Sequence, residues 1–282
     1  MEKAFYFGNF ASSLSKSRNM TKELLEFEGL EKIKVDFNYL ISLFNEMLIS
    51  IGEPELARSL PFNPYEISQN IDHADEKLTQ AIGICFELLN LAEENAATQY
   101  RRKIETEFGL NSTRGSWGET LLSLKNTGKD ENEIAKKLRQ IKVVPVLTAH
   151  PTEAKRLTVL DIHRELYLLL VKRENPNWST SEQAGLKQEI ISLMERWWRT
   201  GEIYLEKPRL EDERNNLMYY FKNVFPEALR LTDQRLKDAW TSMGFSSELL
   251  ELPEHYPMIQ FGSWVGGDRD GHPFVTPEFT AS

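Results

Sequence analysis

The sequence has little cysteine, no long apolar run and no excess of positive charge. Cys85 is the only cysteine in 282 residues, which excludes an internal disulfide and a cysteine-rich zinc site. Apolar runs such as residues 166–171 fall well below the roughly 18 residues that span a bilayer. The first residues lack the basic start, apolar segment and cleavage site of a signal peptide. We therefore expect a cytoplasmic protein that makes no membrane contact.

Charge and composition narrow the class of protein further. Lys and Arg number 34 against 43 Asp and Glu, a net charge of −9. This balance argues against nucleic-acid binding, which needs a basic face, but it allows a local arginine cluster to bind a small anion. Apolar residues make up 40% and charged residues 27%, as in soluble globular proteins, and the length suggests about two domains.

Helical periodicity dominates the chain. Apolar residues at helical spacing predict helices over residues 35–51, 75–108, 153–173, 181–200 and 211–243. In the second of these the expected buried stripe is Leu78, Ile82, Cys85, Phe86 and Leu89. Ser116 and Asp130 are expected to cap two further helices, and Pro226 to break or kink the last one. These patterns predict a mainly α fold with long helices.

Two short segments read as strands instead. Residues 141–149 (IKVVPVLTA) are apolar and β-branched, which favours a strand buried on both faces, although Pro145 removes a backbone donor. Residues 256–265 (YPMIQFGSWV) alternate and predict a second strand. Two strands alone do not make a stable sheet, so we expect further strands outside this chain.

A polar loop follows the first strand. His150 lies where the strand gives way to a helix, Thr152 can cap that helix, and Lys155 and Arg156 follow in its first turn. A helix N-terminus favours anions and disfavours imidazolium, so a neutral His150 could act as general base. The alternative is a structural turn histidine with two solvated cations.

A second polar loop follows the second strand. Gly266 and Gly267 allow close backbone approach to a ligand, and Asp268-Arg269-Asp270 places a guanidinium between two carboxylates. This arrangement could hold Arg269 for an anionic ligand. A surface turn with an internal ion pair explains the same residues. Trp264, just before the loop, either lies in the core, the default for an aromatic residue, or lines a site.

Three blocks together resemble one enzyme family. VLTAHPTEAKRLT (146–158), RWWRTGEIYLEKPRLEDER (196–214) and FGSWVGGDRDGHPFVT (261–276) are similar, in this order, to signatures of phosphoenolpyruvate carboxylase. Val265, His272, Gly201 and Leu157 replace the methionine, asparagine, aspartate and arginine usual in those signatures. Residues 1–139 resemble the family only as a helical N-terminal region.

The resemblance implies the first strands of an incomplete (β/α) barrel. We expect an N-terminal helical region at residues 1–140, and the first barrel strands with inserted helices at 141–282. The family is several times longer, so this chain looks like its N-terminal portion. The metal ligands of the family, for Mg²⁺ or Mn²⁺, lie outside that portion, so we expect the chain alone to be inactive. The parent protein is expected to be a homotetramer.

The implied reaction converts phosphoenolpyruvate and bicarbonate to oxaloacetate and phosphate, a carbon dioxide fixation that feeds the tricarboxylic acid cycle. By resemblance, His150 is the catalytic base, and Trp264 lines an apolar pocket for carbon dioxide. The resemblance also implies that Arg269 and Arg156 bind substrate and that Gly266, Gly267, Asp268 and Asp270 organise the loop.

Two other readings remain open. The chain could be a non-catalytic regulatory or assembly domain that keeps these signatures as structure. It could also be an unrelated phosphate-binding enzyme that uses His150 as base.

Overall fold

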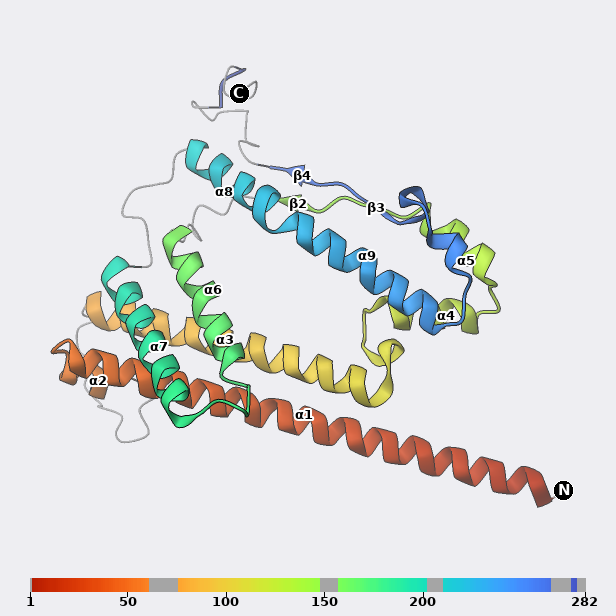
Figure 1. The fold of residues 1–282 in the computed structure, drawn as a ribbon, viewed down its shortest axis with the longest axis horizontal. Coiled ribbons are helices and arrows are strands. Elements are labelled where there is room, and N and C mark those ends of the chain that lie inside the picture. Colours follow the sequence, from red (N-terminus) through yellow and green to blue (C-terminus); the bar gives the residue numbers. More distant parts are fainter. Residues whose placement is uncertain (1, 61–75, 148–156, 202–209, 265–274, 278–282) are drawn as a thin grey trace. The chain divides into compact units, whose positions relative to one another are not determined.

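The computed structural model describes residues 2–60, 76–147, 157–201, 210–264 and 275–277 (Figure 1). Its α-helices are α1 (Glu2–Ser50), α2 (Pro54–Ser59), α3 (Glu76–Phe108), α4 (Trp117–Asn126), α5 (Glu131–Leu138), α6 (Leu157–Lys172), α7 (Thr180–Thr200), α8 (Leu210–Asn223) and α9 (Phe225–Ser242). Short 3₁₀ turns are η1 (Leu110–Ser112), η3 (Ser247–Leu250) and η4 (Pro253–His255). The strands are β1 (Lys142–Val143), β2 (Val146–Leu147), β3 (Met258–Ile259) and β4 (Gly262–Ser263). The predicted mainly α fold is confirmed.

The chain divides into two compact units, each built from two segments. Unit 1 comprises residues 1–104 and 155–203, and unit 2 comprises residues 105–154 and 204–282. Unit 1 therefore holds α1, α2, most of α3, α6 and α7, whereas unit 2 holds the last turn of α3, α4, α5, α8, α9 and the four described strands. The domain boundary at residue 140, which the sequence motifs predicted, remains a prediction.

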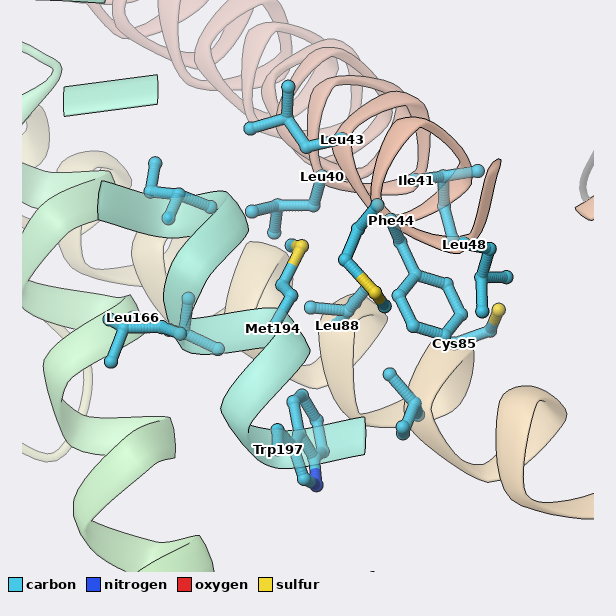
Figure 2. Packing of buried hydrophobic residues seen from close by; sticks show 14 of the residues in the cluster. Leu40, Ile41, Leu43, Phe44, Leu48, Cys85, Leu88, Leu166, Met194 and Trp197 are labelled. Atoms are coloured by element: carbon cyan, nitrogen blue, oxygen red, sulfur yellow. The ribbon is translucent and has the colours of Figure 1, made fainter. Parts of the chain in front are cut away.

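The core of unit 1 lies between α1, α3, α6 and α7, as Figure 2 shows. Phe44 of α1, Leu88 of α3 and Trp197 of α7 are fully buried there. The predicted stripe on α3 is wrong at Phe86, which is 53% exposed. The buried face runs through Ala81, Cys85, Leu88 and Ala92 instead, and Phe86 lies about 100° round the helix from Cys85.

A buried polar network joins three helices of unit 1. Asp36 on α1 and Asn95 on α3 are the buried polar residues of the described core, both at 0% exposure. Asn95 Nδ2 donates to Asp36 Oδ2 at 2.8 Å, and Arg173, just after α6, donates to Asp36 Oδ1 at 3.2 Å. Lys32 and Glu174 complete the network, and the Arg173 guanidinium lies 3.9 Å from the centre of the Tyr39 ring. The Asp36 carboxylate and the Asn95 amide nitrogen are thus paired, as burial of polar groups requires, whereas Asn95 Oδ1 has no hydrogen-bond partner among the described residues.

Unit 2 begins with two capped helices. Ser116 Oγ accepts from the backbone N–H of Glu119 at 3.1 Å, and Asp130 Oδ1 accepts from that of Glu133 at 2.9 Å, so both predicted caps are confirmed. Trp240 of α9 is buried against α4, α5 and η3. The predicted break is also confirmed, because Pro226 lies in the first turn of α9 and Val224 separates α8 from α9.

The predicted strands form a single parallel ladder with a gap. Lys142 pairs with Met258 and Val146 with Gly262, so β1–β3 and β2–β4 lie in one register. In that register, the N–H of residue 145 would donate to the Gln260 carbonyl. Pro145 has no N–H, and each strand is consequently interrupted at this point.

The prediction that the first strand is buried on both faces is wrong. Val143 and Val144 are each 47% exposed, and Val146 is 57% exposed. The physical reason is that the described part of the chain supplies only this one ladder, which leaves the apolar side chains uncovered.

Candidate functional site

The two parallel strands end together. The backbone N–H of Trp264 donates to the Leu147 carbonyl at 2.8 Å, one step beyond the bond from Gly262 to Pro145 at 2.9 Å. Leu147 and Trp264 directly precede the two polar loops of the sequence, which begin more than a hundred residues apart. The ladder therefore brings both loop attachment points to one edge, the carboxyl end of a parallel strand pair. In parallel α/β folds and barrels this edge is where active-site loops gather.

A glycine permits the close pairing near this edge. A Cβ at Gly262 would lie 3.3 Å from Val146 Cγ2, which is tighter than ordinary packing. Trp264 follows two residues later and is 59% exposed, so the default expectation of a core aromatic is wrong for the described chain. The alternative, that Trp264 lines a site, stays a prediction.

Two phenylalanine rings from α8 and α9 pack on a third in the second strand. The rings of Phe225 and Phe261 stack, with centroids 4.3 Å apart and planes 10° from parallel. Phe221 meets Phe261 edge-on at 5.5 Å and Phe225 edge-on at 5.3 Å. Phe261 lies between β3 and β4, whereas Phe221 and Phe225 lie on either side of the break between α8 and α9.

Most of the predicted site residues fall outside the described residues. These are the catalytic candidate His150, the substrate-binding candidates Arg156 and Arg269, and the loop residues Gly266, Gly267, Asp268 and Asp270. Their roles stay predictions. The structure places only their points of attachment, through Leu147 and Trp264.

No metal centre can be assembled from the part of the chain that the structure describes. Within those residues, no three or more His, Cys, Asp or Glu side chains gather as metal ligands would. Likewise, none of the described helices is both long and apolar enough to cross a membrane.

Sequence reasoning missed the phenylalanine cluster. The signal was present, since Tyr219, Tyr220, Phe221 and Phe225 concentrate aromatic residues around the break expected at Pro226. What the sequence could not supply was the partner, because Phe261 lies 36 positions beyond Phe225.

Known proteins are similar to most of this chain. The family model described as phosphoenolpyruvate carboxylase matches residues 66–282. The chain belongs to the phosphoenolpyruvate carboxylase family. The match reaches well ahead of the three signature blocks and includes most of the helices of both units.

Individual carboxylases are similar over much of this chain. The phosphoenolpyruvate carboxylase of Methylorubrum extorquens is 38% identical over 205 residues, which cover 71% of this chain and 21% of that protein. The enzyme of Amaranthus hypochondriacus is 35% identical over 204 residues, covering 68% of this chain and 20% of the relative. The chain thus spans about a fifth of the length of the curated carboxylases it matches.

Proposed function

We propose that this chain is the N-terminal portion of an enzyme that carboxylates phosphoenolpyruvate with bicarbonate, giving oxaloacetate and phosphate. Family membership supports the enzyme class. The observation that carries the proposal for this site is the hydrogen bond from Trp264 to Leu147, because it joins the ends of the two strands that lead into the signature loops. The parent protein is proposed to be cytoplasmic and a homotetramer.

The proposed reaction begins with a phosphoryl transfer. A bicarbonate oxygen attacks the phosphorus of phosphoenolpyruvate and the bond to the enol oxygen breaks, which leaves carboxyphosphate and the pyruvate enolate. Arg269 and Arg156 would bind the anionic substrate, since guanidinium groups match phosphate and carboxylate oxygens. Gly266, Gly267, Asp268 and Asp270 would fix the pose of Arg269.

His150 is proposed to act in the second step. As a neutral imidazole it would take the carboxyl proton of carboxyphosphate, which then releases carbon dioxide and phosphate. The methylene carbon of the enolate attacks carbon dioxide and forms the new carbon–carbon bond. Trp264, exposed at the end of the ladder, would line the apolar wall that keeps water from the enolate.

The family's divalent cation, Mg²⁺ or Mn²⁺, supplies positive charge that offsets the phosphate and enolate charges. The described residues offer no cluster of ligands for it. From the family resemblance we propose that the metal ligands lie in a part of the parent protein outside this chain, and that the chain alone is inactive.

Substitution of His150 tests the proposal. In the full-length protein, His150→Asn should lower the rate of oxaloacetate formation by a factor of about 10² or more, as expected for loss of a general base. A variant that loses stability but keeps its turnover would instead favour a non-catalytic domain. Consumption of phosphoenolpyruvate without any need for bicarbonate would favour an unrelated phosphate-binding enzyme.

Two further measurements address the parent protein. An antibody against this segment should detect, in the source cells, a species several times heavier than 32.7 kDa. Metal-dependent oxaloacetate formation by the isolated 282-residue chain, lost on His150→Asn, would contradict the proposed inactivity of this portion.

A further inference from the structure

The strand that leads to Trp264 is weakest where the ladder has its gap. Pro145 cannot donate to the Gln260 carbonyl, so a hydrogen bond is missing between the pair Lys142–Met258 and the pair Val146–Gly262. Phe261 directly follows Gln260. Contacts to the Phe261 ring therefore act on the strand directly beside the missing bond.

The rings of α8 and α9 meet Phe261 at this point. Phe221 and Phe225 are four residues apart, a spacing that places both side chains on one side of a helix. Their rings remain in edge-to-face contact across the break at Val224, and together they contact the Phe261 ring on its face and its edge. Tyr220 stacks on the outer side of this group, with its centroid 6.0 Å from that of Phe225.

The start of α9 fixes the position of the Phe225 ring. Phe225 is the first residue of α9, and Pro226 follows in the first turn, where its fixed φ favours the helix. Val224 provides no side-chain cap for α9. The beginning of this helix is thus connected to the strand by aromatic contacts.

We propose that Phe225, with Phe221, is a positioning residue that holds Phe261 and thereby sets the direction in which β4 places Trp264. No atom of Phe225 needs to touch substrate for this role. The effect of this positioning on catalysis rests on the proposed function, whereas the effect of Phe225 on the strand does not.

Hydrogen exchange of the full-length protein tests the hold on the strand. In Phe225→Leu, the peptide covering residues 257–264 should exchange about tenfold faster, the factor expected when one aromatic pair is lost. Phe225→Tyr keeps the stacked ring and should restore the slow exchange. Unchanged exchange of this peptide in Phe225→Leu would overturn the proposal.

A matched substitution in the same unit separates this effect from general loosening. Phe245 packs on Trp240, with ring centroids 4.7 Å apart, in the hydrophobic cluster that α4, α5, α9 and η3 form. Phe245→Leu should speed exchange around residues 236–250 and leave residues 257–264 unchanged. If both variants loosen both regions equally, Phe225 is merely structural and the proposal fails.

Product analysis tests the catalytic consequence. With β4 misdirected, water should reach the enolate, which then takes a proton and leaves as pyruvate. Phe225→Leu should therefore raise the ratio of pyruvate to oxaloacetate, and Phe225→Tyr should return it to the parent value. Faster exchange with an unchanged product ratio would confirm the hold on the strand and overturn its catalytic consequence. If the parent protein forms no oxaloacetate at all, the proposed function fails, whatever the exchange result.

Discussion

Asn95 and Asp36 join two helices by a hydrogen bond of 2.8 Å in which neither side chain is exposed to solvent. Asp36 also accepts from Lys32 at 2.7 Å and from Arg173 at 3.2 Å. One buried carboxylate thus serves three donors from α1, from α3 and from the residue that follows α6.

Removal of this carboxylate should destabilise unit 1 strongly. Asp36→Ala leaves the Asn95 amide and two cations without their shared acceptor, and we expect a loss of about 3 kcal/mol in the free energy of unfolding. Denaturant unfolding measures it. Glu55→Ala is the control, because its ion pair with Arg58 is largely exposed and should cost less than about 0.5 kcal/mol.

Glu174 should give the same network an acid dependence. Burial pushes the pKa of Glu174 up, but hydrogen bonds from Lys32 and Asn95 and the charges of Lys32 and Arg173 outweigh it, so the pKa lies below its usual 4.5. A carboxyl whose pKa is lower in the folded state stabilises the fold above pH 4.5 and loses that effect as pH falls through the folded value.

The variant Glu174→Gln should therefore lose less stability than the parent between pH 5 and pH 3. Thermal unfolding across this range checks the prediction. Glu165→Gln, at a surface carboxylate that is 53% exposed, should follow the parent curve. A Glu174→Gln curve parallel to the parent would show that Glu174 contributes no such acid dependence.

Cys85 should be inert in the folded protein. Burial in the core of unit 1 raises the pKa of this thiol to about 12, and the thiolate is the reactive form. At pH 8 a thiol reagent should label Cys85 only after unfolding in guanidinium. Rapid labelling without denaturant would mean that unit 1 opens readily around α3.

Two glycine-to-alanine substitutions should have opposite effects. A Cβ at Gly118 would lie 2.3 Å from the Leu110 carbonyl oxygen, a backbone atom that cannot move aside cheaply, so Gly118→Ala should destabilise unit 2. A Cβ at Gly185 meets nothing within 4 Å, so Gly185→Ala in α7 should stabilise unit 1 by about 0.5–1 kcal/mol through helix propensity. Melting temperatures of the two variants test both signs.

Trp264→Ala in the full-length protein should change the product more than the rate of substrate consumption. On the proposed function, loss of the indole admits water to the enolate, so pyruvate should rise at the expense of oxaloacetate. Trp264→Phe should retain most of the oxaloacetate. Equal falls in both products would indicate that Trp264 acts on substrate binding instead.

Local signals predicted much of the helical structure. Ser116 and Asp130 cap their helices as expected, because capping depends on neighbours within three residues. Pro226 interrupts the last long helix for an equally local reason. Periodicity failed at Phe86, since several faces of α3 are apolar in sequence, and only the position of α1 and α7 decides which of them is buried.

The sequence predicted the motifs of the candidate site, but it did not predict the long-range contacts that hold the strands before those motifs in place. The residues before His150 and Gly266 read as strands, yet the sequence did not show that they pair with each other in parallel, since pairing depends on contacts across more than a hundred residues. The contact of Phe261 with Phe225, and that of Asp36 with Asn95, are long-range in the same way. Such partners follow from tertiary packing, which periodicity does not report.

The long separation between the paired strands has a consequence during synthesis. At ribosomal rates of about 5–20 residues per second, β1 and β2 are made roughly ten seconds before β3 and β4 exist to pair with them. Meanwhile the valines at positions 143, 144 and 146, exposed even in the finished ladder, have no strand beside them. A nascent chain that presents a β-branched apolar segment for that time is a natural client for a ribosome-associated chaperone.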